Sequence, residues 1–177
     1  MNEVPEIWLI TGIPGAGKST VARLLAESFE RAAYVEGDVL RRFVVSGVAW
    51  PEGRELDGEA ERQFELAIRN QCLLARSFAE AGFLPILDGV IVMQHHLDAY
   101  TGYLAGGRLR LVVLAPEAEV AAGRNQQRET AAPDFRQLDG VMREQLAGQG
   151  LWIDSSSQSA EQTVAAILAD VDGTLLE

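Results

Sequence analysis

Eight consecutive residues near the start of the chain, Gly12 to Ser19, limit what it can fold into more than any other feature. They match a pattern of one glycine, four residues of any type, a second glycine, a lysine and a serine or threonine. An apolar run, residues 7–11, comes before them, and apolar residues at helical spacing follow from Lys18 to Phe29. The pattern predicts a strand, a tight loop and a helix that bind phosphate groups.

The chemistry of this loop assigns a part to its residues. Glycines let successive backbone N–H groups turn toward phosphate oxygens, and the helix adds the positive end of its dipole. Lys18 is expected to bridge the outer phosphates, and Ser19 to offer its hydroxyl to Mg²⁺. The alternative is a glycine-rich turn with a serine that caps the helix. The residues predicted to bind the phosphates of a nucleotide here are Gly12, Ile13, Pro14, Gly15, Ala16, Gly17, Lys18, Ser19 and Thr20.

Apolar runs alternate with helical patterns along the rest of the chain. Fully apolar strands joined by helices indicate a parallel sheet covered on both faces, so the fold class is α/β. No repeat or linker divides residues 1–177, which we interpret as one domain. Further strands are expected at 32–35, 83–87, 109–115 and 151–153, helices at 39–46, 59–81, after Pro116, at 137–147 and 160–169, and a loop at 47–58.

Composition excludes several classes of protein. With 26 acidic and 15 basic residues the net charge is −11, which disfavours nucleic acid as a partner. Cys72 is the only cysteine, so no intramolecular disulfide can form. No run approaches the length needed to span a bilayer, and the start of the chain lacks a signal pattern. We therefore expect a cytoplasmic protein without membrane partners.

With these features the sequence resembles the P-loop small-molecule kinases, which include gluconate and shikimate kinases and chloramphenicol phosphotransferase. The resemblance rests on the loop at 12–19, the Gly37-Asp38 turn, Asp88 after the third strand, and a helix with arginines after the fourth. It implies a three-layer P-loop sandwich with a five-stranded parallel sheet. It also implies binding of ATP and Mg²⁺, and a small helical lid over the phosphates, at about residues 120–137.

Two aspartates lie where strands end, which is where open α/β sheets bind ligands. The resemblance implies that Asp38 orients or deprotonates the hydroxyl of an acceptor, and the alternative is that it caps the following helix. Asp88 is expected near the magnesium ion or the substrate. Its alternative role is a turn formed with Gly89.

Several arginines are candidates for contact with ATP or the acceptor. Arg124 and Arg128 lie four residues apart on a predicted helix, so both could neutralise phosphate charge from the lid, and Arg136 is a weaker third candidate. The alternative is a solvated helix surface. Arg41 and Arg42 follow Asp38 by three and four residues, so at least one should face the same crevice and contact the acceptor. Their alternative is a plain surface role.

Three further residue types have structural interpretations. Trp50 is expected to pack beneath the loop at 47–58 rather than close the acceptor pocket. The neighbouring histidines His95 and His96 suit neither a helical nor a strand metal face, so we interpret them as surface or cap residues. Cys72 is expected to be a small buried apolar side chain.

These features favour an ATP-dependent kinase that transfers the γ-phosphoryl group to a hydroxyl of a small metabolite or antibiotic. The first alternative is a nucleoside or nucleotide kinase, although an acceptor phosphate would call for more arginines than Arg41 and Arg42. The second is an ATP-binding or ATPase module that is not a kinase. The expected partners are ATP and the acceptor, with the protein a monomer or homodimer.

Overall fold

Five parallel strands form the central sheet in the order β2-β3-β1-β4-β5. The structure is a computed structural model that describes residues 5–49, 58–127 and 136–176. The number and direction of the strands confirm the α/β expectation, and every strand lies within two residues of its predicted place. The strands are β1 (Glu6–Thr11), β2 (Ala32–Glu36), β3 (Leu84–Gly89), β4 (Arg108–Leu114) and β5 (Leu151–Ile153).

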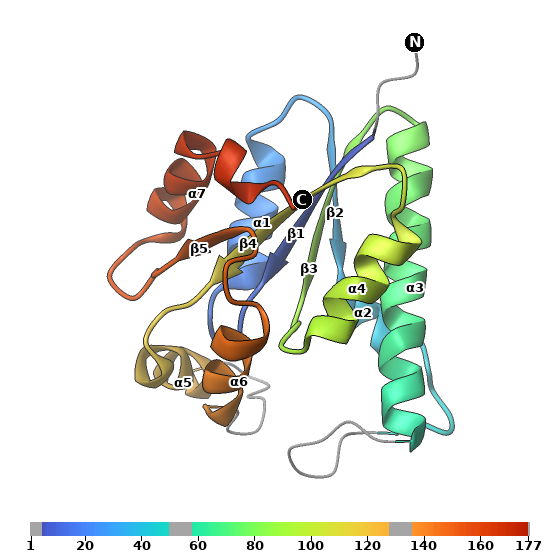
Figure 1. Cartoon of the computed structure of the whole chain (residues 1–177), viewed down its shortest axis with the longest axis horizontal. Helices are drawn as coiled ribbons and strands as arrows, with labels where there is room; N and C mark the ends of the chain where they lie inside the picture. Colours follow the sequence, from blue (N-terminus) through green and yellow to red (C-terminus); the bar gives the residue numbers. More distant parts are fainter. Residues whose placement is uncertain (1–4, 50–57, 128–135, 177) are drawn as a thin grey trace.

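Helices cover both faces of the sheet and form three layers (Figure 1). α1 and α7 pack together on one face, while α3 and α4 pack together on the other. α5 and α6 lie near the ends of β4 and β5 (Figure 1). The helices are α1 (Lys18–Glu27), α2 (Gly37–Arg41), α3 (Gly58–Glu80), α4 (Gln94–Tyr103), α5 (Ala118–Gln126), α6 (Gln137–Gln145) and α7 (Ala160–Ala169), followed by the 3₁₀ turn η1 (Asp172–Thr174).

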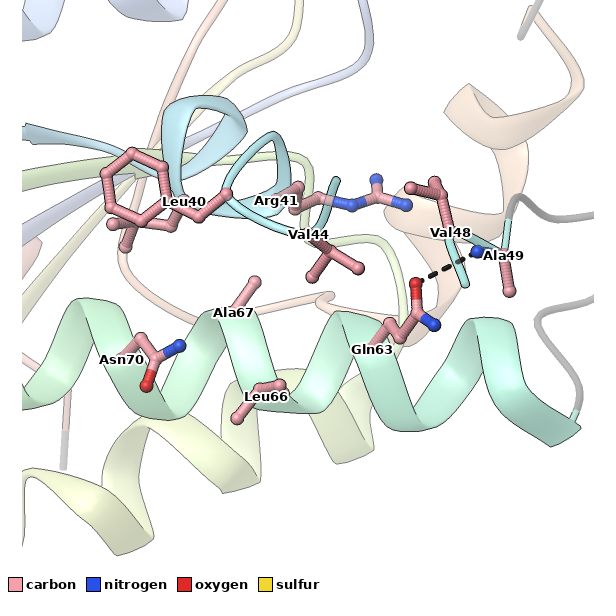
Figure 2. A pocket seen from close by; sticks show the side chains of 10 residues that line it. Leu40, Arg41, Val44, Val48, Ala49, Gln63, Leu66, Ala67 and Asn70 are labelled. Atoms are coloured by element: carbon pink, nitrogen blue, oxygen red, sulfur yellow. Dashed lines mark hydrogen bonds between the residues drawn. The ribbon is translucent and has the colours of Figure 1, made fainter. Parts of the chain in front are cut away.

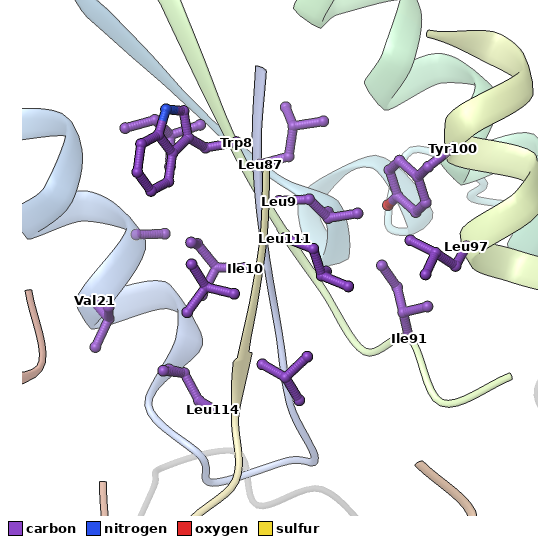
Figure 3. Packing of buried hydrophobic residues seen from close by; sticks show 14 of the residues in the cluster. Trp8, Leu9, Ile10, Val21, Leu87, Ile91, Leu97, Tyr100, Leu111 and Leu114 are labelled. Atoms are coloured by element: carbon purple, nitrogen blue, oxygen red, sulfur yellow. The ribbon is translucent and has the colours of Figure 1, made fainter. Parts of the chain in front are cut away.

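β1 is the centre of the hydrophobic core. Side chains alternate between the two faces of a strand, so Trp8 and Ile10 point toward α1 while Leu9 points toward α4 (Figure 3). All three are almost fully buried. The burial of both faces explains why these strands read as continuous apolar runs, and it fixes β1 between β3 and β4.

Two helices differ from the sequence prediction. The helix expected at 39–46 is the five-residue α2, which ends at Arg41, and beyond it Phe43 and Val45 are exposed. β-branched residues and Gly47 disfavour its continuation. α4 was not predicted at all, because its apolar residues are not gathered into a clear stripe along one face. Among the described residues, no helix combines the length and apolarity needed to cross a membrane.

A buried glutamine on α3 ties the helical layer to the strand ends. Gln71 donates from Nε2 to the carbonyl oxygens of Val35 at 2.7 Å and Asp88 at 2.9 Å. Its Oε1 accepts a hydrogen bond from the hydroxyl of Tyr100 on α4. Gln71 is 1% exposed, so these groups depend on it rather than on water.

We predict that Gln71→Met lowers the free energy of unfolding by about 3 kcal/mol. The change keeps the side-chain volume but leaves the Tyr100 hydroxyl and two carbonyls without this partner, at about 1–3 kcal/mol for each buried unpaired group. Chemical denaturation measures the effect. Arg69→Met, at an exposed position on α3, is the control and should change stability by less than about 0.5 kcal/mol. Equal losses in both variants would contradict the role of Gln71.

Candidate nucleotide and acceptor site

The phosphate-binding motif forms the loop between β1 and α1. The N–H of Ala16 donates to the carbonyl oxygen of Ile13 at 3.0 Å, and Lys18 Nζ donates to the same oxygen at 3.2 Å. The N-cap of α1 is Gly17, and no side chain caps the helix there. The Ser19 hydroxyl instead donates to Asp88. The alternative of a turn with a capping serine is therefore wrong.

Glycine is required in this loop by backbone conformation and by space. Gly15 has φ +86°, and a Cβ there would lie 2.0 Å from the carbonyl oxygen of Ala121 on α5. Gly17 has φ +95°, with nothing within 4 Å of a Cβ built on it. Left-handed φ values favour glycine. The loop therefore packs against α5 at Gly15 and faces open space at Gly17.

Asp88 joins three elements at the strand ends. Its Oδ2 accepts hydrogen bonds from Ser19 Oγ at 2.8 Å and from the Tyr34 hydroxyl at 3.1 Å. Its Oδ1 accepts from the N–H of Gly37 at 3.2 Å. The carboxylate is 3% exposed and lies within β3. Its side chain thus links β3 to α1, β2 and α2, which is more than a turn-forming role with Gly89.

Asp38 lies in the first turn of α2, where β2 has ended, and its side chain is exposed. The N-cap residue of α2 is Glu36, and it makes no side-chain capping bond. The alternative role of Asp38 as a helix cap is therefore wrong. Since Gly37 is bonded to Asp88, Asp38 is held near the phosphate loop.

Arg41, the last residue of α2, and Arg42, which follows it, have different surroundings. The Arg41 guanidinium lies 5.3 Å from the centre of the Phe64 ring on α3. Burial lowers the pKa of Arg41, and the nearby charge of Asp38 opposes this shift. Arg42 is exposed and lies 3.9 Å from Glu36. Of the two candidates, Arg41 is thus the one near Asp38.

A pocket of about 120 Å³ opens between α2, the chain that follows it, and α3. Arg41 reaches along it from α2, while Gln63 lies opposite on α3 (Figure 2). Gln63 accepts from the N–H of Ala49 at 2.9 Å and donates to the carbonyl of Gly47 at 2.7 Å. The pocket is lined by Leu40, Arg41, Phe43, Val44, Val48, Ala49, Gln63, Leu66, Ala67 and Asn70.

Arg124 on α5 reaches the loop between β5 and α7. Its Nη2 donates to the carbonyl oxygens of Ser155 at 3.0 Å and Ser156 at 3.2 Å. Arg136 pairs with Glu119 at 2.7 Å on the protein surface. Arg128 and Trp50 lie outside the described residues. The expected lid segment begins in α5 and ends at α6. Of its described residues, Ala121 and Asn125 on α5 lie against Gly15 of the phosphate loop.

The sequence analysis did not single out Tyr34 or Gln71, although both touch Asp88. Burial raises the pKa of Tyr34, and the charge of Asp88 raises it further, so the phenol stays protonated and can donate. The one signal for Gln71 is its place beside the apolar stripe Ile68, Cys72 and Ala75, where a buried polar side chain needs partners.

The prediction for Cys72 is confirmed, and the prediction for the histidines is half wrong. Cys72 is 1% exposed, and burial raises the pKa of its thiol to about 12. His95 is exposed, but His96 is 2% exposed and packs on Phe64 with ring centres 4.4 Å apart. Burial lowers the pKa of His96, opposed by its bond to Glu61. The cause is α4, which turns neighbouring residues to different surroundings.

Comparison with known proteins decides the family. A sequence profile described as an AAA domain matches residues 7–151, which is most of the chain. The chain belongs to the AAA domain family. This match covers the phosphate loop, all of the sheet except Glu6 and most of β5, and the strand-end residues Asp38 and Asp88.

Several proteins that are similar to this AAA domain protein are named as kinases. An adenylyl-sulfate kinase of Burkholderia ambifaria is 25% identical over 94% of this chain and 92% of its own. A sugar kinase from Janibacter has a TM-score of 0.69 at 19% identity, covering 96% of this chain and 95% of that one. The Mycobacterium tuberculosis APS kinase, solved with AMPPNP and APS, has a TM-score of 0.67 at 16% identity, covering 96% and 98%. The P-loop kinase fold is thus confirmed, and with it a nucleotide-binding loop.

We predict that Tyr34→Phe lowers the free energy of unfolding by about 1 kcal/mol. The change removes one hydrogen bond to the buried Asp88 carboxylate and leaves the ring in place. Thermal or chemical denaturation measures it. Tyr103→Phe is the matched control, because the Tyr103 hydroxyl makes only a long bond of 3.3 Å to the exposed Glu65. Unchanged stability of Tyr34→Phe would show that Asp88 does not need this donor.

Proposed function

We propose that the protein is an ATP-dependent phosphotransferase that moves the γ-phosphoryl group to a hydroxyl of a small molecule, a metabolite or an antibiotic. The observation that carries the proposal is the 2.8 Å hydrogen bond between Ser19 and Asp88. It joins the phosphate loop to the end of β3, and Asp88 in turn holds Gly37, next to Asp38. A phosphate-binding loop and an exposed carboxylate therefore share one edge of the sheet.

The donors at this edge fit Mg²⁺. A serine hydroxyl and a carboxylate are the oxygen ligands that Mg²⁺ prefers, and here they lie together beside the loop. Ser19 and Asp88 would hold the ion with the phosphates of ATP, directly or through water. When bound, Mg²⁺ neutralises charge on the phosphate oxygens.

Binding of ATP would use groups that the loop and α5 already bring together. Lys18 would exchange its bond to the Ile13 carbonyl for the outer phosphates, which offer more negative charge. Arg124 lies one turn beyond Ala121, against which Gly15 packs. Its flat guanidinium, held by the carbonyls of Ser155 and Ser156, could stack on an adenine ring. Arg128 remains a candidate to contact the phosphates from the lid.

Transfer itself needs alignment and a place for one proton. The acceptor oxygen forms a bond to the γ-phosphorus as the bond from that phosphorus to the β,γ-bridging oxygen breaks, and ADP leaves. Asp38 would accept the proton of the acceptor hydroxyl, or orient it. Arg41 would hold a polar group of the acceptor at the mouth of the pocket. Asp88 is the second candidate for contact with the acceptor.

The arginines near the pocket favour an enzyme that phosphorylates a hydroxyl group over the alternative of a nucleotide kinase. Arg41 lines the pocket, whereas Arg42 is exposed and near Glu36. Among the described residues that line the pocket, a phosphate acceptor would therefore meet one arginine and, beside it, the repulsive charge of Asp38. An ATPase module would need no exposed carboxylate there. We also propose that the protein works in the cytoplasm as a monomer or homodimer.

We predict that Asp38→Asn lowers acceptor-dependent turnover by about 100-fold or more, which is typical for the loss of a general base. The measurement is ATP consumption with Mg²⁺ across a library of hydroxylated metabolites, nucleosides and antibiotics. ATP binding should be unchanged, because the phosphate loop is intact. Glu27→Gln, at an exposed position on α1, is the control. If no compound raises turnover and Asp38→Asn matches the parent protein, the kinase proposal is wrong.

We predict that Arg124→Ala weakens ATP binding by about tenfold, which is roughly the 1–2 kcal/mol of a stacked guanidinium. Titration calorimetry with ATP and Mg²⁺ measures it. Arg108→Ala, at an exposed position at the start of β4, should bind ATP normally. If Arg124→Ala loses stability but keeps its affinity for ATP, Arg124 serves only to hold the loop after β5.

A further inference from the structure

A second group of candidate ligands lies between α3 and α4, apart from the phosphate loop. His95 Nε2 lies 3.1 Å from Glu61 Oε1, and His96 Nε2 lies 2.9 Å from the same oxygen. Glu61 belongs to the first turn of α3, and both histidines belong to the first turn of α4. The two helices run side by side (Figure 1). Three ligand atoms from two helices thus converge on one point.

Hydrogen bonding alone leaves this group poorly satisfied. Both imidazoles contact the same carboxylate oxygen, while the other, Glu61 Oε2, is buried without a hydrogen-bond partner. His96 is 2% exposed, and its Nδ1 also lacks a partner. A buried unpaired carboxylate oxygen costs free energy. A cation beside Oε1 and Oε2 would compensate both oxygens.

The distances suit a tetrahedral metal ion. With bonds of 2.0–2.1 Å to zinc, neighbouring ligand atoms lie roughly 3.3 Å apart. The two measured distances to Glu61 Oε1 are close to that value, and all three ligand atoms lie within 4.8 Å of one another. Phe64 packs on the His96 ring and limits its movement. Exposure of His95 leaves room for a water as fourth ligand.

We propose that Glu61, His95 and His96 form a binding site for a zinc-like divalent transition metal ion that holds the first turns of α3 and α4 together. Two imidazoles and one carboxylate are ligands that suit Zn²⁺, whereas Mg²⁺ prefers oxygen alone. The site is independent of the proposed kinase activity. It borders the acceptor side, because Phe64 contacts both His96 and Arg41.

Zn²⁺ itself, added without nucleotide to protein that carries no histidine tag, is the probe. His95 and His96 are the only histidines in the chain, so long-range ¹H–¹⁵N spectra contain the signals of two imidazole rings. We predict that one equivalent of Zn²⁺ shifts the Nε2 resonances of both and raises the melting temperature. Calorimetry should give at least tenfold weaker binding for His95→Ala and for Glu61→Gln.

Asp98→Asn is the matched control, because it removes a carboxylate of α4 that lies outside the cluster. It should bind Zn²⁺ as the parent protein does. His95 is exposed, so His95→Ala should fold, and circular dichroism checks this. Equal affinity in His95→Ala and the parent protein, or no shift of either imidazole signal, would overturn the proposal.

Discussion

The buried carboxylate of Asp88 is the contact on which the candidate site depends. It lies at the end of β3 and accepts hydrogen bonds from Ser19, Tyr34 and Gly37. These donors belong to α1, β2 and α2, so one side chain sets the relative positions of the phosphate loop and of α2, where the acceptor is proposed to bind. A buried charge is tolerated only with such partners, and the Gln71 bond to the Asp88 carbonyl fixes the backbone from which it projects.

The fold explains why these groups meet at all. β1 is flanked by β3 on one side and β4 on the other, and in parallel sheets the crevice for ligands lies outside the carboxyl ends at such a point. The loop after β1 packs against α5 at Gly15. The turn after β2 presents Asp38 and Arg41. The phosphate loop and the residues proposed to bind the acceptor thus lie at the same edge of the sheet, which supports the proposed transfer.

Much of this could be predicted from sequence because it depends on local patterns. Continuous apolar runs gave the strands, and the glycine spacing gave the loop. α4 was missed because its apolar residues form only a weak amphipathic pattern. His96 packs on Phe64 and is bonded to Glu61, both more than 30 residues away in the sequence. The different surroundings of Arg41 and Arg42 follow from where α2 ends. Contacts made across the fold, such as those of Tyr34 and Gln71, leave little trace in one sequence.

The fate of the γ-phosphoryl group tests the central claim most directly. ATP labelled with ³²P in the γ-phosphate would be incubated with the protein, Mg²⁺ and pools of hydroxylated small molecules, and the products separated by chromatography. The account predicts that the label appears in an organic phosphate, formed only when one particular acceptor is present. Label released solely as inorganic phosphate, at a rate that no acceptor changes, would contradict transfer and support an ATPase module instead.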